Sequence, residues 1–244
     1  PVDEEGIVLN ERPCDYYYVT PGHQVPTGVT MSSARRRQLL EHAARHDAVI
    51  IEDDYDSESN FTLNPLPALK ASDRSGRVVY VSSLSKALSP GLRLGFMVAD
   101  PDLIDEARAL RRLVYRHPPT NIQYQMAHFL AQGHYETHLR RYHYDSAQRW
   151  ERLHAALQRY LPSCRALAGS EHANAFWLQT PAQINTQQLT WRAAHAGVLI
   201  EPGARHFLST APPDNYFRMG FHAINPDAIA QGVEVLRGQL EQMG

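Results

Sequence analysis

The chain has 244 residues, of which 43% are hydrophobic and 20% are charged, and its formal net charge at pH 7 is −2. This composition is that of an ordinary globular protein, and the charge gives no reason to expect that this chain itself binds nucleic acid or a membrane. No apolar run approaches the length of a membrane span, and the isolated Cys14 and Cys164 favour a cytoplasmic protein with reduced thiols.

The first half of the chain alternates strand and helix patterns. An aromatic and β-branched run begins at residue 16 and is stopped by Pro-Gly at 21–22. Ser32 and Ser33 are candidate N-caps for a helix over 34–46. Apolar strands are then predicted at 48–55, 77–86 and 94–100. Strands separated in this way by helices or loops predict an α/β fold with a mostly parallel sheet.

The second half is mainly helical up to about residue 160 and then becomes mixed. Helices are predicted at 100–116, 120–161, 186–196 and 227–243, and strands at 173–180, 197–203 and 215–222. We therefore expect two domains, a large domain over 1–145 and a small α+β domain over 146–244. The chain begins at Pro1 in a stretch typical of a domain interior, so we expect the large domain to be incomplete at its N-terminal side.

Polar residues follow the strand patterns at 48–55 and 77–86. The second of these strands runs into Ser82–Lys86, and an arginine, Arg93, follows seven residues later. A lysine at a strand end can form a Schiff base with a bound carbonyl compound. Ser83, Ser85 and Arg93 add hydroxyls and a planar charged group that suit phosphate oxygens.

The other strand ends in the acidic stretch EDDYDSE at 52–58. Ligands bind at the carboxyl ends of parallel strands, so we expect both polar segments to share one site. Asp53 offers a carboxylate for a pyridine nitrogen, and Tyr55 offers a phenol for a ring oxygen. Pyridoxal phosphate (PLP) uses groups of all these kinds. The alternative roles for this stretch are a solvated turn or a divalent metal site, although it lacks the glycine of a calcium loop.

Four stretches carry a resemblance that extends over nearly the whole chain. They are TPGHQVPTGVTMSSARRRQLL (20–40), VIIEDDYDSE (49–58), VVYVSSLSKALSPGLRLGFMV (78–98) and NYFRMGFHAINPDAI (215–229). The chain resembles the fold type I, aspartate-aminotransferase-like PLP proteins, and within them the MocR group of GntR-type transcriptional regulators. In that group such a domain follows an N-terminal helix-turn-helix module. The resemblance therefore implies a PLP-binding, effector-sensing domain that binds DNA only through a missing N-terminal part.

The resemblance also implies roles for individual residues. Lys86 matches the lysine that forms the internal aldimine with PLP. The matching cofactor contacts are Asp53 at the pyridine nitrogen, Tyr55 at the ring oxygen, and Ser83, Ser85 and Arg93 at the phosphate. Arg218, in YFRMGF, matches the arginine that binds the carboxylate of an amino-acid ligand. A homodimer with its site near the subunit interface is implied in the same way.

Two departures from the family pattern bear on the cofactor pocket. Aminotransferases commonly have an asparagine in an NPTG stretch, whereas this chain reads HQVPTG and has Val25 at that position, so His23 or Gln24 is expected to help at the ring oxygen. The glycine-rich segment that binds the phosphate in the family, and the aromatic residue that stacks on the ring, lie earlier than any matching residue here. We therefore expect a segment outside the chain, or a partner chain, to complete the pocket.

Two other readings of the whole chain stay open. A free-standing PLP-dependent aminotransferase would use the same residues, with Lys86 as the proton shuttle. A chain that binds no cofactor is the third possibility. No metal site is expected, since His134 and His138 are four residues apart but lack a third ligand at a recognisable spacing. The basic run ARRRQ at 34–38 is read as an exposed helix face.

Overall fold

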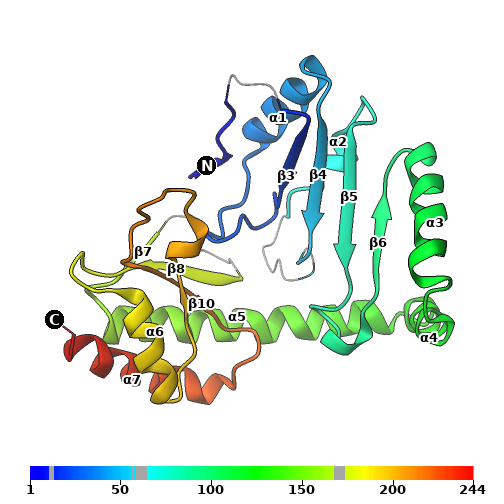
Figure 1. Cartoon of the computed structure of the whole chain (residues 1–244). Coiled ribbons are helices and arrows are strands. Elements are labelled where there is room, and N and C mark those ends of the chain that lie inside the picture. The colour runs from blue at the N-terminus through cyan, green and yellow to red at the C-terminus, as the bar shows by residue number, and fades with distance from the viewer. Residues whose placement is uncertain (11–13, 57, 59–64, 168–173, 244) are drawn as a thin grey trace. The chain divides into compact units, whose positions relative to one another are not determined.

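The computed structural model describes the chain except for residues 11–13, 57, 59–64, 168–173 and 244 (Figure 1). The chain divides into two compact units. The first unit comprises Pro1–Gln24 and Thr30–His143, and the second comprises Val25–Val29 and Tyr144–Gly244. Ser57, in the acidic stretch that carries part of the family resemblance, lies outside the described residues.

A four-stranded sheet with the order β3-β4-β5-β6 forms the centre of the first unit (Figure 1). Its strands are β3 (Tyr16–Val19), β4 (Val49–Asp54), β5 (Val78–Ser83) and β6 (Gly95–Val98). The first three are parallel, which confirms the predicted mostly parallel sheet, whereas β6 is antiparallel to β5. A short connection joins β5 to β6, closed by a 3.0 Å hydrogen bond from the Leu84 N–H to the Leu94 carbonyl. Short connections of this kind favour antiparallel pairing.

The helix between β3 and β4 shows how the sequence builds this unit. In α1 (Ser33–Arg45), the Ser32 hydroxyl accepts a 3.1 Å hydrogen bond from the Arg35 N–H, which confirms Ser32 as the N-cap. Leu39 and Ala43 lie on the buried face of α1 and pack with Ile50 of β4 in one hydrophobic cluster. The helix thereby covers one face of the sheet near the start of β4.

The remaining elements of the first unit are a small hairpin and mainly helices. They are β1 (Val2–Asp3), β2 (Gly6–Ile7), α2 (Leu69–Ser72), the 3-10 turn Pro90–Leu92, α3 (Pro101–Tyr115) and α4 (Thr120–Ala131), followed by α5 (His134–Tyr160), which continues into the second unit. The single helix predicted over 120–161 is therefore two helices. Gly133 separates them because its φ of 71° lies in the left-handed region, which glycine adopts easily.

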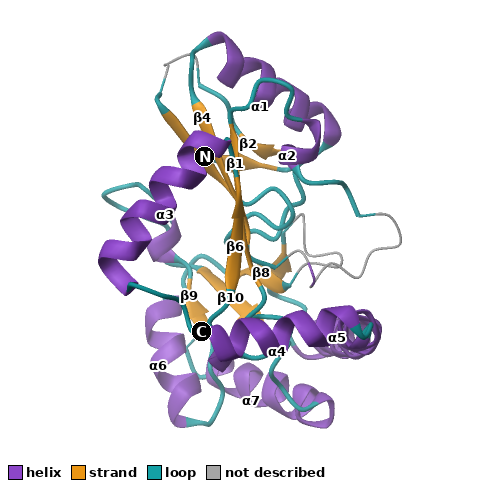
Figure 2. Ribbon diagram, turned by 90° about the vertical axis from the view of Figure 1, so that its right-hand side faces the viewer, coloured by secondary structure: helices purple, strands orange, loops and turns teal. Residues whose placement is uncertain are grey.

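The second unit contains an antiparallel sheet with the order β7-β8-β10-β9. Its strands are β7 (Arg165–Ala166), β8 (Ala175–Gln179), β9 (Glu201–Pro202) and β10 (Tyr216–Gly220), with the 3-10 turns Ala204–His206 and Pro226–Ala228. Helices α6 (Thr186–His195) and α7 (Ile229–Glu241) pack against each other (Figure 2). Phe176 of β8, Phe217 of β10 and Leu236 of α7 are fully buried and form part of its core. The strand predicted over 197–203 is confirmed only for the two residues of β9.

Candidate functional site

The two polar segments singled out in the sequence lie at the same edge of the first sheet. Strands β4 and β5 are parallel neighbours, and their register pairs Asp54 with Ser82 at their carboxyl ends. Tyr55 and Asp56 continue from β4, and Lys86 follows β5 by three residues. The expectation that these strand ends share one place in the fold is met by this pairing.

Lys86 lies at the centre of the contacts at this edge. Its Nζ donates a 2.9 Å hydrogen bond to Oδ2 of Asp56 and lies 4.6 Å from the centroid of the Tyr55 ring. The side chain is 30% exposed, so the amine is neither fully solvated nor sealed in the core. The structure thus brings Lys86 and Tyr55 together as the sequence predicted. The carboxylate that contacts the lysine, however, is Asp56, a residue that the sequence analysis did not single out.

Asp56 is buried and binds two basic side chains through one oxygen. His23 Nδ1 lies 3.1 Å from the same Oδ2 that accepts from Lys86. Burial alone would raise the pKa of the Asp56 carboxyl, but the hydrogen bond and charge of His23, together with Lys86, outweigh it and lower the pKa to about 2. Asp56 is therefore ionised at neutral pH and provides a fixed negative charge beside the lysine amine.

Replacing Asp56 with asparagine is expected to destabilise the chain by about 2 kcal/mol at pH 7. The folded-state pKa of about 2 lies below the ordinary value of 3.8, so the stabilisation is present above pH 3.8 and is lost as the pH falls through the folded pKa. The difference between wild type and Asp56→Asn should therefore shrink between about pH 4 and pH 2 in denaturant unfolding curves.

Asp54→Asn is the matched control for that measurement. Burial raises the pKa of Asp54, and its carboxylate accepts a 2.8 Å hydrogen bond from the Tyr80 hydroxyl, which an asparagine oxygen can also accept. Removing this carboxylate should not lower stability at pH 7, because a raised folded pKa means that the ionised form is disfavoured by folding. A loss in Asp54→Asn equal to that in Asp56→Asn would contradict the assignment of the stabilising charge to Asp56.

Asp53 faces a different neighbour. The Tyr18 hydroxyl donates a hydrogen bond to Oδ2 of Asp53. Tyr18 lies on β3 opposite Ile51, so it reaches the residue two positions further along β4 on the same face of the sheet. Burial, followed by the hydrogen bond and charge of Asp53, raises the pKa of Tyr18 to about 12. Sequence reasoning missed Tyr18, because the run YYYV does not show which of its tyrosines faces the end of β4.

Glu52, in the same acidic stretch, has a structural role. It is almost completely buried, and its two oxygens accept hydrogen bonds of 2.7 and 2.9 Å from the N–H groups of Leu69 and Lys70 at the start of α2. Burial raises its pKa. The carboxylates of this stretch therefore have separate tasks, and across the described residues no group of three or more His, Cys, Asp or Glu side chains is arranged to hold a metal ion.

The predicted phosphate ligands lie in the connection from β5 to β6. The Ser85 N–H donates a 3.2 Å hydrogen bond to the Ser83 hydroxyl, and Ser85 is buried. Arg93 is exposed and has a φ of 49°, in the left-handed region that non-glycine residues rarely adopt. Within the described residues no hydrogen bond joins Arg93 to either serine. The structure thus brings the two serines together and leaves the guanidinium exposed to solvent.

His23 and Gln24 precede the Val25 position that departs from the family pattern. Both are buried. His23 contacts Asp56, and Oε1 of Gln24 accepts a 3.4 Å hydrogen bond from the Thr20 hydroxyl. A contact of either side chain with a cofactor ring stays a prediction.

Arg218 belongs to the second unit, unlike the other predicted site residues. It lies on β10 opposite Glu201 of β9, and its guanidinium donates to Glu201 Oε2 at 3.3 Å and to Asn174 Oδ1 at 3.5 Å. Glu201 also pairs with Arg205 at 2.7 Å and with His206 at 3.2 Å. Arg218 is therefore already matched with a carboxylate in this structure.

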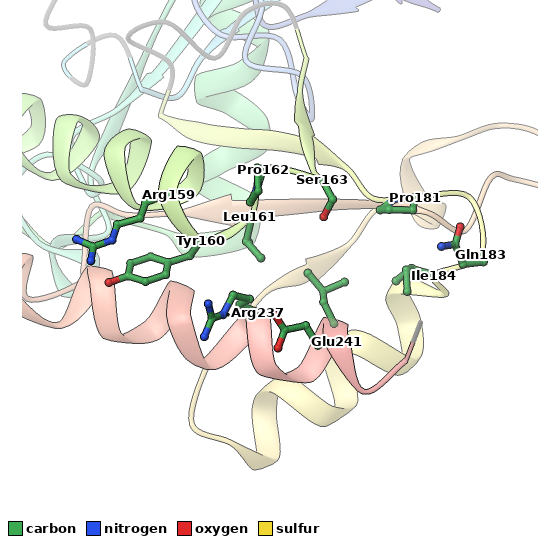
Figure 3. Close-up of a pocket in the computed structure, with 11 residues that line it drawn as sticks. Arg159, Tyr160, Leu161, Pro162, Ser163, Pro181, Gln183, Ile184, Arg237 and Glu241 are labelled. Atoms are coloured by element: carbon green, nitrogen blue, oxygen red, sulfur yellow. Dashed lines mark ion pairs between the residues drawn. The ribbon is translucent and has the colours of Figure 1, made fainter.

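A separate cavity of about 360 Å³ lies in the second unit (Figure 3). It is formed by the end of α5, the loop after it, and α7, and the guanidiniums of Arg159 and Arg237 lie 5.1 and 5.9 Å from the Tyr160 ring centroid. Its described lining contains none of the predicted site residues.

No helix in the described part of the chain is long and apolar enough to cross a membrane.

Comparison with known proteins gives consistent matches. The family model described as aminotransferase class I and II matches residues 19–236. The HTH-type transcriptional regulator TauR of Rhodobacter capsulatus is 38% identical over 95% of this chain and 48% of its own length. The probable rhizopine catabolism regulatory protein MocR of Rhizobium meliloti is 34% identical over 97% of this chain and 48% of its own length. The chain thus spans about half the length of these curated relatives.

Solved structures match as well. Kynurenine aminotransferase of Pyrococcus horikoshii has a TM-score of 0.89 and 27% identity, over 99% of this chain and 63% of its own. LysN, the α-aminoadipate aminotransferase of Thermus thermophilus, has a TM-score of 0.88 and 27% identity, over 100% of this chain and 64% of its own. The LysN structure is a complex with N-(5'-phosphopyridoxyl)-L-leucine. These proteins share the fold type I aminotransferase architecture predicted from the sequence.

Proposed function

We propose that this chain, which belongs to the aminotransferase class I and II family, is the PLP-binding, effector-sensing domain of a MocR-type transcriptional regulator of the GntR superfamily. The observation that carries the cofactor part of the proposal is the position of Lys86, which lies beside Tyr55 and Asp56 at the carboxyl ends of two parallel strands. The similarity to TauR and MocR supports a regulator. Residues 1–145 would form the large cofactor-binding domain and residues 146–244 the small domain.

The groups at this edge of the sheet fit PLP chemically. A carboxylate and a phenol lie at the end of β4. An amine, two hydroxyls and a guanidinium lie at the end of β5 or follow it. When bound, PLP supplies an aldehyde and an electron-withdrawing pyridine ring. We propose that the residues that would hold it are Lys86 at the aldehyde, Asp53 at the pyridine nitrogen, Tyr55 at the ring oxygen, and Ser83, Ser85 and Arg93 at the phosphate.

Each of these side chains has a definable task. Asp53 would hold a proton on the pyridine nitrogen, and Tyr18 orients Asp53 through its hydrogen bond to Oδ2. Tyr55 would donate to the ring oxygen, and Lys86 would supply the amine that a ligand amine displaces. Arg218 would bind the carboxylate of an amino-acid-like effector, for which a bidentate guanidinium is suited.

The similarity to regulators supports a proposal about the partners. Because the regulators TauR and MocR are about twice the matched length, we propose that a DNA-binding module and the glycine-rich phosphate-binding segment lie in parts of the protein outside this chain. We also propose a homodimer in the cytoplasm. An effector can change DNA binding only if it has different affinities for two states of the regulator.

The second candidate function is a PLP-dependent aminotransferase. It is favoured by the solved structures of high TM-score, which are aminotransferases. The two functions share their site residues, so the pocket chemistry does not separate them. They differ in turnover: an enzyme releases its keto-acid product and is regenerated by an acceptor, whereas a sensor holds the ligand.

The test is to load the full-length protein that contains this chain with PLP, add each of the twenty standard amino acids, and follow both the cofactor absorbance and the consumption of 2-oxoglutarate. We expect at least one amino acid to change the absorbance without sustained consumption of the acceptor. Sustained consumption would identify an aminotransferase instead. If PLP acquires no protein-bound absorbance band in the full-length protein that contains this chain, the cofactor proposal fails.

A further inference from the structure

The contacts of Asp56 are not explained by the proposed cofactor roles. A single oxygen, Oδ2, binds both the Lys86 amine at 2.9 Å and His23 Nδ1 at 3.1 Å. Asp56 and His23 are 2% and 3% exposed, whereas the Lys86 side chain is 30% exposed. A buried and fixed carboxylate thus holds the end of a longer and more exposed side chain.

His23 fixes this carboxylate from the other side. An ionised carboxylate can accept hydrogen bonds but cannot donate them, so Nδ1 of His23 is the donor in this contact. His23 lies on the segment after β3 and Asp56 on the segment after β4, and these two strands are parallel neighbours. The pair therefore joins two loops at the sheet edge and orients Oδ2 towards the lysine.

We propose that Asp56, oriented by His23, is a positioning residue for Lys86. Asp56 anchors the lysine ammonium beside the Tyr55 ring whenever the amine is not bonded to the cofactor. It also governs how readily the ammonium gives up its proton. This inference rests on the proposed function, because it assigns the resting position of the lysine that would capture PLP. It gives Asp56 a task distinct from that of Asp53, which contacts Tyr18 instead.

The physical consequence is a dependence of lysine reactivity on pH. An anion within hydrogen-bond distance favours the charged form of an amine, and an opposite charge this close typically shifts a pKa by about 1–3 units. Only the neutral amine attacks an aldehyde. The neighbouring titratable and charged groups are Arg36, Glu52, Asp54, Tyr55, Glu58, Tyr80 and His138. All of them are retained in a variant in which Asp56 alone is changed.

The sequence offers an internal reference for this test. The chain contains two lysines, Lys70 and Lys86. Lys70 pairs with Asp73 at 3.2 Å and is 23% exposed, so both lysines are partly buried and paired with an aspartate. A titration that resolves the two lysines therefore gives the titration midpoint of the Lys86 amine. In the same sample, the Lys70 signal shows whether the fold around Lys70 is intact.

The first experiment is an NMR pH titration of the two lysine amines in the chain without PLP. We expect Asp56→Asn to lower the titration midpoint of Lys86 by about one pH unit or more. Lys70 serves as the reference in the same spectra. Asp54→Asn should shift the Lys86 midpoint less than Asp56→Asn does, because the Asp54 carboxylate accepts from the Tyr80 hydroxyl and Asp56 accepts from Lys86 itself. An unchanged Lys86 midpoint in folded Asp56→Asn would overturn the inference, and it would do so without reference to PLP.

The second experiment is the rate of covalent capture of PLP by the same variants, measured by borohydride trapping and mass spectrometry of the Lys86 peptide. Asp56→Glu keeps the charge but moves it by one methylene, so we expect capture of PLP about tenfold slower than in wild type. The titration midpoint of Lys86 in Asp56→Glu should stay close to that of wild type. Wild-type capture rates in Asp56→Glu would overturn the positioning role even if Asp56→Asn did not fold. If the full-length wild-type protein captures no PLP, the proposed function fails, and the NMR titration then tests only the contact between Asp56 and Lys86.

Discussion

Replacing Lys86 with alanine is expected to abolish covalent capture of PLP by this chain. The chain has two lysines, and Lys86 is the one that lies at the carboxyl ends of β4 and β5 beside a phenol and a carboxylate. The loss should be complete rather than graded, because no other side chain at this edge offers a primary amine. The measurement is the protein-bound PLP absorbance band, supported by mass spectrometry after borohydride reduction.

Lys70→Ala is the matched control for this result. Lys70 has similar exposure and also pairs with an aspartate, but its side chain lies at α2 against Asp73. Its contact with Glu52 is made by the backbone N–H and survives the substitution. We expect wild-type capture in Lys70→Ala. An adduct that persists in Lys86→Ala, or that moves to Lys70, would show that PLP binds by nonspecific condensation and would remove the basis of the proposed site.

The position of this lysine could be predicted from the sequence because it depends on local patterns. The apolar runs before Asp53 and before Ser82 identify two buried strands, and polar residues begin where each strand ends. The carboxyl ends of parallel strands meet at one edge of the sheet, so the two polar segments were expected to lie together. Hydrophobic pattern and chain connectivity were sufficient for that conclusion.

The choice among the carboxylates of the acidic stretch could not be made in the same way. Side chains alternate between faces only within a strand, and β4 ends at Asp54. Beyond that point the direction of Asp56 depends on the backbone of the loop and on His23, which is 33 residues away in the sequence. The contact between Tyr18 and Asp53 likewise depends on the register of β3 against β4. Neither pairing is visible in composition or periodicity.

The helix predicted over 120–161 shows a related limit. Helical spacing is strong on both sides of Gly133, so the pattern favours continuity, yet the chain forms α4 and α5 as separate helices. A glycine in a helical pattern is compatible either with a continuous helix or with a helix end. The positive φ of Gly133, which decides between them, is a property of the folded backbone.

Replacing Arg218 with alanine is expected to weaken the response of the PLP-loaded chain to amino acids by about a hundredfold. The guanidinium is 23% exposed and lies between Glu201 and Asn174, so its removal takes away a positioned, partly desolvated charge. The measurement is the amino-acid concentration that gives half of the absorbance change. Arg218→Lys keeps the charge but loses the planar pair of donors, so an intermediate loss is expected.

Arg205→Ala is the matched control, since Arg205 pairs with the same Glu201 but is 63% exposed. Exposed ion pairs contribute little, so we expect a change of about threefold or less. A primary amine without a carboxylate, such as n-butylamine, should act equally on wild type and Arg218→Ala. Equal weakening for the amine and the amino acids would contradict carboxylate binding by Arg218 and would indicate a general loss of structure.

The pairing of Arg218 with Glu201 also sets the strength of the expected response. In the proposed function, a ligand carboxylate that reaches Arg218 would replace the Glu201 carboxylate rather than fill an unpaired site. The net gain in binding free energy would therefore be smaller than at an unpaired arginine. Glu201 keeps Arg205 and His206 as partners after such an exchange, and it is therefore not left as an isolated charge. Exchange between two satisfied arrangements would make binding readily reversible, as the proposed sensing of amino-acid concentration requires.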